Sequence, residues 1–110
     1  MKIGLIRCMK TEDKCPGTNC FKAMYKKKAA FKDIEEEIEL IGVTTCGGCP
    51  GKKAAARAAK MIRKGANAIA LSSCITRGNP KGNICPYLEE MKQAITKKLG
   101  ENIELIEHTH

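Results

Sequence analysis

Three of the seven cysteines in this chain stand directly after short apolar runs. These three residues are Cys8, Cys46 and Cys74. If the runs are parallel strands, their carboxyl ends lie at one edge of one sheet, and the three sulfurs gather there. This placement predicts a thiol-lined crevice, which a metal ion or redox sulfur chemistry would explain most simply.

The other four cysteines are expected in the segments just after the same strand ends: Cys15, Cys20, Cys49 and Cys85. A chain of 110 residues buries a core without disulfide staples. The cysteine count is odd, and the apolar stretch after Met1 is too short for a signal peptide or a membrane span. We therefore expect a reducing cytoplasm, where clustered cysteines indicate metal binding or catalysis rather than structural bridges.

Strand and helix signals alternate along the chain, which predicts a single α/β domain over residues 1–110. The expected strands are residues 2–7, 37–44, 67–73 and 102–107. The expected helices are residues 20–33, 50–64 and 86–99. This alternation indicates a three-layer fold in which a four-stranded parallel sheet lies between helices.

The composition of the expected strands predicts their order. Residues 2–7 and 68–73 are nearly free of acidic groups, as strands buried on both faces should be. Residues 37–41 and 103–107 alternate with glutamate, as edge strands can. With right-handed crossovers the order is 2-1-3-4, a winding that resembles the flavodoxin-like fold. Winding then reverses between strands 1 and 3, where ligands bind in open α/β sheets.

Two expected loops, residues 8–19 and 74–85, are long for a compact α/β domain, and each carries cysteines. Long loops inside small domains tend to be functional. In the second loop, Arg77 and Lys81 either bind an anion or face solvent, and the sequence does not decide between these alternatives.

The most specific motif is Cys46-Gly47-Gly48-Cys49 at an expected strand-to-helix turn. The spacing lets both sulfurs reach one metal ion, or each other. The two glycines relieve steric conflict and leave amide groups free to point at sulfur. Pro50 is expected to begin the next helix, whose positive end stabilises thiolate.

Other soft ligands flank this motif. Cys15 and Cys20 are separated by a four-residue spacer, which suits a metal loop or a disulfide but also an ordinary turn. Cys85 precedes a proline, as the last cysteine of bacterial ferredoxin motifs does, although the rest of that spacing is absent. His108 and His110 follow the last strand and are either ligands or part of a disordered tail.

Residues 46–51, together with Cys8, Cys74, Cys85-Pro86 and the Thr109-His110 ending, make the whole chain resemble the CGGC-domain family. The resemblance implies a small prokaryotic protein whose cysteines and histidines bind metal, with zinc as the usual proposal. It implies site roles for these residues: Cys8, Cys46, Cys49, Cys74, Cys85 and His110. The resemblance assigns no role to Cys15 and Cys20.

The net charge of +8 raises the alternative of a nucleic-acid-binding module. Metal-bound cysteines are thiolates, so a loaded site would reduce that charge. Only four aromatic residues are present, and none lies in a basic strand that could stack bases. Solvated helix faces explain the basic runs more simply.

The sequence therefore predicts a metal-binding protein rather than an enzyme, with the metal in a crevice at the carboxyl ends of the strands. The candidate ligands are Cys8, Cys15, Cys20, Cys46, Cys49, Cys74, Cys85 and His110. Zinc is slightly favoured over an iron–sulfur cluster. Both take four such ligands, and the cysteine spacing does not separate them. The alternative is a thiol–disulfide oxidoreductase using Cys46 and Cys49. No catalytic set typical of hydrolases is present, and no membrane partner is expected.

Overall fold

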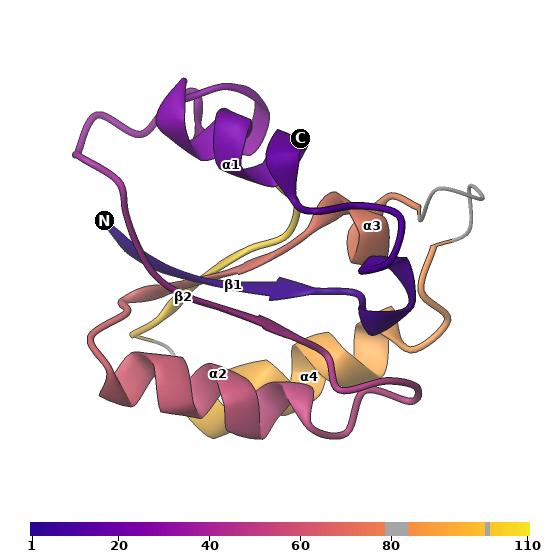
Figure 1. Ribbon diagram of the computed structural model, residues 1–110. Coiled ribbons are helices and arrows are strands. Elements are labelled where there is room, and N and C mark those ends of the chain that lie inside the picture. Colours follow the sequence, from indigo (N-terminus) through magenta and orange to yellow (C-terminus); the bar gives the residue numbers. More distant parts are fainter. Residues whose placement is uncertain (79–83, 101) are drawn as a thin grey trace.

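A sheet of four parallel strands forms the centre of the molecule, and helices cover both of its faces (Figure 1). The computed structural model describes residues 1–78, 84–100 and 102–110. The strands are β1 (Lys2–Arg7), β2 (Glu39–Thr45), β3 (Ala68–Leu71) and β4 (Glu104–Ile106). The α-helices are α1 (Thr18–Tyr25), α2 (Ala54–Arg63), α3 (Ser73–Thr76) and α4 (Leu88–Leu99). Two 3-10 turns, η1 (Met9–Thr11) and η2 (Ala29–Phe31), complete the described elements.

The strand order is β2-β1-β3-β4, which confirms the predicted α/β fold, its parallel sheet and its winding. The two central strands are the ones without acidic groups: Ile3 to Ile6 of β1 and every residue of β3 are buried. The edge strands β2 and β4 carry the glutamates and are more exposed. Strand composition therefore identified the edges correctly, because an edge strand can turn charged side chains toward water.

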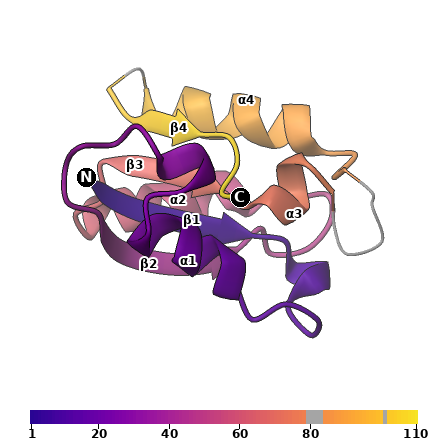
Figure 2. The same ribbon diagram turned by 90° about the horizontal axis from the view of Figure 1, so that it is seen from above.

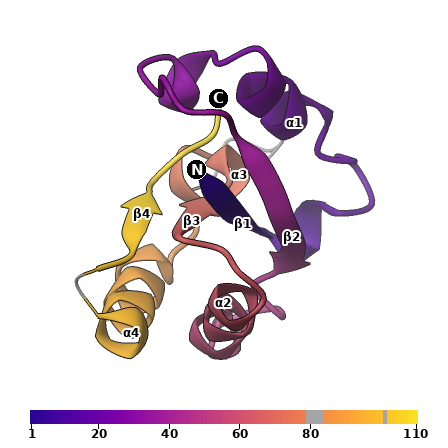
Figure 3. The ribbon, with the colours of Figure 1, turned by 90° about the vertical axis from the view of Figure 1, so that its left-hand side faces the viewer.

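Each face of the sheet has its own core (Figure 3). On one face, α1 and η2 pack on β1 through Met24, Phe31, Ile3 and Leu5, and residues of β3 belong to the same cluster. On the other face, α2 and α4 pack side by side, with Met61 and Met91 among the residues of a second cluster. Because both faces are covered, β1 and β3 are buried on both sides, as parallel strands usually are.

The helices are shorter than the sequence predicted, and backbone conformation explains why. The predicted helix 20–33 ends at Tyr25, because Lys27 and Ala29 both adopt a positive φ of 50° and the chain turns into η2. Pro50 does not begin α2, because Gly51 has a φ of +79° and the helix starts only at Ala54.

The third strand is also shorter than predicted, since it ends at Leu71 and Ser72 caps α3. α3 and η1 were not predicted. Both follow the central strands directly, beyond the carboxyl ends of those strands (Figure 2). None of the helices in the described part of the chain is long and apolar enough to cross a bilayer.

Gly4 lets α2 approach β1 closely. A Cβ atom on Gly4 would lie 2.8 Å from Sδ and 3.0 Å from Cβ of Met61. The Cβ atom of Met61 is bonded directly to the α2 backbone, so rotation of the methionine side chain alone does not remove the overlap.

We expect Gly4→Ala to lower the free energy of unfolding by about 1–3 kcal/mol, because overpacking forces helix and sheet apart. Urea unfolding followed by circular dichroism measures this loss. A change within the error of the wild-type value would contradict the tight packing of α2 on β1.

Candidate functional site

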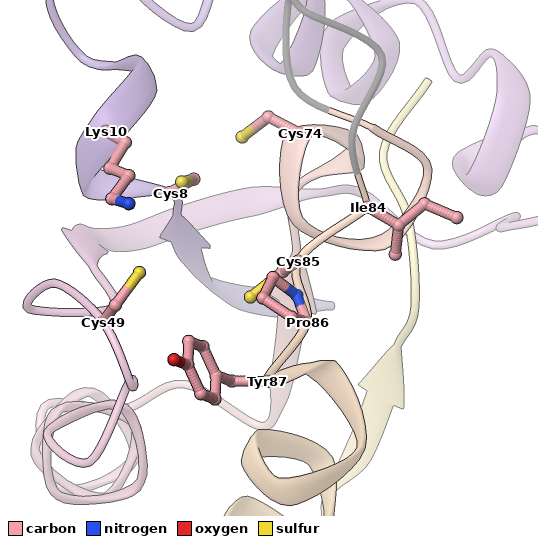
Figure 4. Close-up of a pocket in the computed structure, with 8 residues that line it drawn as sticks. All are labelled: Cys8, Lys10, Cys49, Cys74, Ile84, Cys85, Pro86 and Tyr87. Carbon is pink, nitrogen blue, oxygen red and sulfur yellow. The ribbon is translucent and has the colours of Figure 1, made fainter.

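Four cysteines line one pocket of about 450 Å³ at the carboxyl ends of the central strands (Figure 4). The thiol pocket, as we call it, is lined by Cys8, Lys10, Cys49, Cys74, Ile84, Cys85, Pro86 and Tyr87. The four cysteines come from four separate segments of the chain, and their sulfurs are directed toward the same space (Figure 4). The structure therefore brings together half of the predicted ligand set in one cavity.

The reversal of winding between β1 and β3 positions two of these thiols. Cys8 directly follows β1 and caps η1, while Cys74 lies in the first turn of α3, just beyond the end of β3. The amide of Cys85 donates a hydrogen bond of 3.0 Å to the carbonyl oxygen of Ile75 in α3, which ties the third thiol to the same place. Two neighbouring strand ends and one loop thus form this side of the pocket.

The CGGC turn supplies the fourth thiol. Gly47 and Gly48 have φ values of +82° and +94°, which side chains rarely allow. A Cβ atom at Gly47 would lie 2.9 Å from Cβ of Lys53, and one at Gly48 would lie 3.2 Å from Cε of Met9. Both glycines therefore relieve steric conflict, as predicted.

The two cysteines of the CGGC turn have different surroundings. Cys46 is 5 % exposed, and its amide donates a hydrogen bond of 2.9 Å to the carbonyl oxygen of Arg7 at the end of β1. Cys49 is exposed and lines the thiol pocket, whereas Cys46 lies behind the lining in the core beneath it. One thiol of the motif thus faces incoming molecules and the other does not.

The thiols are close enough to affect one another's ionisation. Burial raises the pKa of Cys8 above its ordinary value, and the proximity of Cys46 and Cys74 raises it further. Burial likewise raises the pKa of Cys85, with contributions from Cys49 and Cys46. These two thiols are therefore protonated at neutral pH, and Cys46 neighbours both sides of the pocket.

Cys15 and Cys20 lie apart from the thiol pocket, near the N-terminal end of α1. Cys20 is 3 % exposed in the core beneath α1, and its sulfur lies 3.2 Å from Oγ1 of Thr109. The carbonyl oxygen of Cys15 accepts a hydrogen bond from the Arg7 guanidinium. Neither cysteine lines the pocket. Burial is the main cause of the raised pKa of Cys20, and Cys74 is close enough to raise it further.

A hydroxyl network that the sequence did not reveal holds the C-terminus beside α3. The Ser73 hydroxyl accepts hydrogen bonds of 3.1 Å and 3.0 Å from the amides of Thr109 and His110, and donates one of 2.8 Å to the His110 carbonyl oxygen. Ser72 lies next to this network, with its hydroxyl 2.7 Å from the sulfur of Cys74. The tail is therefore ordered against the segment that carries Cys74.

The two histidines take positions outside the described lining of the thiol pocket. The side chain of His110 is exposed, and only its main chain is held by Ser73. His108 lines a neighbouring hollow with Arg77, Lys92 and Glu107. Burial, the Arg77 charge and His110 lower its pKa, while Glu107 opposes them. Lys81, suggested as an anion ligand beside Arg77, lies outside the described residues.

All seven cysteines are free thiols. Within residues 1–78, 84–100 and 102–110, no three side chains of His, Cys, Asp or Glu are already placed to hold one metal ion. The pocket therefore presents soft donors without a finished coordination sphere. Lys10 and Tyr87, which also line it, were not predicted, because a lone lysine or tyrosine in sequence carries no positional signal.

Burial of the Cys20 thiol makes the free energy of unfolding depend on pH in the alkaline range. The folded-state pKa of Cys20 is raised, so the folded state retains a proton that the unfolded chain loses above about pH 8.5. The free energy of unfolding should therefore fall as the pH rises from about 8 to 9.5.

Urea unfolding at several pH values under reducing conditions measures this fall. Cys20→Ala should unfold at lower urea concentration throughout but show a shallower dependence on pH. Equal pH dependences for the two proteins would contradict the assignment to Cys20.

Comparisons with known proteins identify the family of this chain. The model of the CGGC domain matches residues 2–110. The uncharacterized protein MJ0582 of Methanocaldococcus jannaschii is 39% identical over 112 residues, covering 96% of this chain and 81% of that protein. A second uncharacterized protein of this organism, MJ0766, is 36% identical over 69 residues, covering 62% of this chain and 98% of that protein. No solved structure matches the chain. The chain belongs to the CGGC-domain family.

Proposed function

We propose that the protein binds a thiophilic metal ion in the thiol pocket, with ligands drawn from Cys8, Cys49, Cys74 and Cys85. The observation that carries this proposal is the meeting of four thiols from four chain segments in one cavity. An apolar or catalytic pocket has no need for four sulfurs. Cys46, buried behind them, is available as a further ligand if the site closes around the metal.

The chemistry of the donors fits soft or borderline metals. Thiolates favour zinc, copper(I) and iron–sulfur clusters over magnesium or calcium. We favour zinc. An iron–sulfur cluster is the second candidate, since it also accepts four cysteine ligands. When bound, such a metal would hold the thiolates in their ionised form and would link η1, α3 and the CGGC turn to one another.

Binding must include movement of side chains, because no three ligands in the described part of the chain already surround one point. The CGGC turn suits such movement. Cys49 is exposed and follows two glycines, whose backbones change conformation easily. Cys15, Cys20 and His110 lie outside the lining of the thiol pocket and would contribute to a second site if more than one metal binds.

Metal binding is better supported than thiol–disulfide exchange by Cys46 and Cys49. The pocket holds three thiols beyond that pair, those of Cys8, Cys74 and Cys85. The pKa values of Cys8 and Cys85 are raised, which makes these two thiols poor nucleophiles at neutral pH. A dithiol relay gains nothing from them, whereas a cation next to such thiols lowers their pKa values and uses them as ligands.

Zinc titration of the reduced protein under anaerobic conditions tests the proposal. We expect uptake of about one equivalent. Alkylation followed by mass spectrometry should show zinc protecting Cys8, Cys49, Cys74 and Cys85, while Cys15 reacts equally with and without zinc. Absence of uptake, or protection of Cys15 alone, would contradict the proposal.

A further inference from the structure

The outward face of α2 carries a stripe of positive charge. Residues 52–64 contain six basic residues and no acidic one. Four of these follow one another at helical spacing and form what we call the α2 stripe: Lys53, Arg57, Lys60 and Lys64. At 1.5 Å per residue the stripe is about 16 Å long. The opposite face of α2 is buried through Ala54, Ala58 and Met61.

The charges of the stripe oppose one another. Like charges three or four residues apart on a helix destabilise it by about 0.2–0.5 kcal/mol per pair. The ion pairs found among the described residues involve Lys92 and the N-terminus, and none involves α2. A partner that carries negative charge would remove this repulsion.

The CGGC turn joins the stripe to the thiol pocket. On one side, Lys53 and Arg57 pack over Gly47, and Arg57 donates hydrogen bonds of 3.1 Å and 3.0 Å to the carbonyl oxygen and Oγ1 of Thr45. On the other side, the methyl group of Met9 lies over Gly48. The stripe, the turn and the pocket therefore form one continuous surface.

Two large apolar side chains are exposed on this surface. Met9 is 41% exposed beside the turn, and Ile84 is 55% exposed where it lines the pocket. The exposed thiol of Cys49 and the ammonium group of Lys10 lie at the same pocket (Figure 4). Apolar side chains flanked by charged ones are the usual composition of a protein–protein interface.

We propose that the α2 stripe and the rim of the thiol pocket dock a protein partner with an acidic surface. The stripe complements acidic side chains of the partner, and Met9 and Ile84 contact apolar side chains of the partner. A nucleic acid fits less well, because phosphates make no use of Met9 or Ile84 and α2 carries no aromatic side chain for stacking. The docking rests on charge and apolar contact and does not depend on the proposed function.

Two matched triple variants and three probes test the docking. K53Q/K60Q/K64Q removes three charges from the stripe, and K22Q/K26Q/K32Q removes three from exposed positions in and around α1, across the sheet. The probes are a fluorescent peptide of glutamates with a leucine at every fourth position, an all-glutamate peptide and a DNA duplex of equal charge. Fluorescence anisotropy at low and high salt gives the affinities.

We expect the stripe variant to bind the leucine-containing peptide at least about tenfold more weakly than wild type, and the control variant less than about twofold more weakly. The leucine-containing peptide should also bind more tightly than the all-glutamate peptide. Equal losses in the two variants would mean that net charge alone attracts the probe, and tighter binding of the duplex would assign the surface to nucleic acid. Either result overturns the proposal.

Zinc uptake by the same two variants separates this inference from the proposed function. The stripe lysines do not line the thiol pocket, so both variants should take up zinc as wild type does. Weak peptide binding with normal zinc uptake in wild type contradicts the docking surface alone. Specific peptide binding without zinc uptake contradicts the metal site and leaves the docking intact.

Discussion

Replacing Cys8 or Cys85 by serine is expected to lower the affinity for zinc by about a hundredfold or more. A serine hydroxyl remains protonated and is a poor ligand for a soft or borderline metal. Both cysteines line the thiol pocket, whereas Cys15 does not. Cys15→Ser therefore provides a matched control that removes one thiol and should retain most of the affinity. Competition with a chromophoric zinc chelator measures the zinc dissociation constant of each of the three variants and of wild type.

The double variant C8S/C85S should lose little more affinity than either single variant, because ligands of one ion act together. Additive losses would indicate two separate metals. The redox alternative predicts a different pattern for the CGGC pair. If metal content is unchanged and only one of Cys46→Ser and Cys49→Ser traps a mixed disulfide, the protein is an oxidoreductase and the metal assignment is wrong.

Zinc affinity should rise steeply with pH, by up to about a factor of ten per pH unit for each thiol that must ionise. Burial, with contributions from neighbouring cysteines, raises the pKa values of Cys8 and Cys85, so protons occupy these ligands at neutral pH and compete with the metal. The competition weakens as the pH increases toward the pKa of each thiol, where the slope flattens.

Calorimetry in buffers of different ionisation enthalpy counts the protons released on zinc binding. Cys8→Ser should release about one proton fewer than wild type. A zinc affinity independent of pH between 6 and 8 would show that thiols are not the ligands, because a cysteine that is protonated throughout this range must release its proton when it binds zinc.

The sequence was sufficient to predict the arrangement of the sheet. Glutamates in β2 and β4 identified the edges, and apolar β1 and β3 identified the centre. The chain order then placed Cys8 and Cys74 at the point where winding reverses. These predictions succeeded because burial on both faces of a parallel sheet constrains every residue of a central strand.

The sequence was not sufficient to separate the cysteines into groups. Cys20 was expected in the same crevice as Cys49, but α1 buries it on the far side of the pocket lining. Its partner Thr109 is 89 residues away, and the Ser73 hydroxyl that holds the tail lies 36 residues from Thr109. Contacts at such distances leave no local pattern. Short helices such as α3 escape prediction because four residues are too few to show periodicity.

X-ray absorption spectroscopy of the zinc-loaded protein tests the thiol pocket as a metal site most directly. The proposed site predicts a first shell dominated by sulfur, with zinc–sulfur distances of about 2.3 Å. It also predicts that this shell loses sulfur in Cys85→Ser and remains unchanged in Cys15→Ser. A shell made of oxygen and nitrogen alone, near 2.0 Å, would contradict metal binding by the thiol pocket.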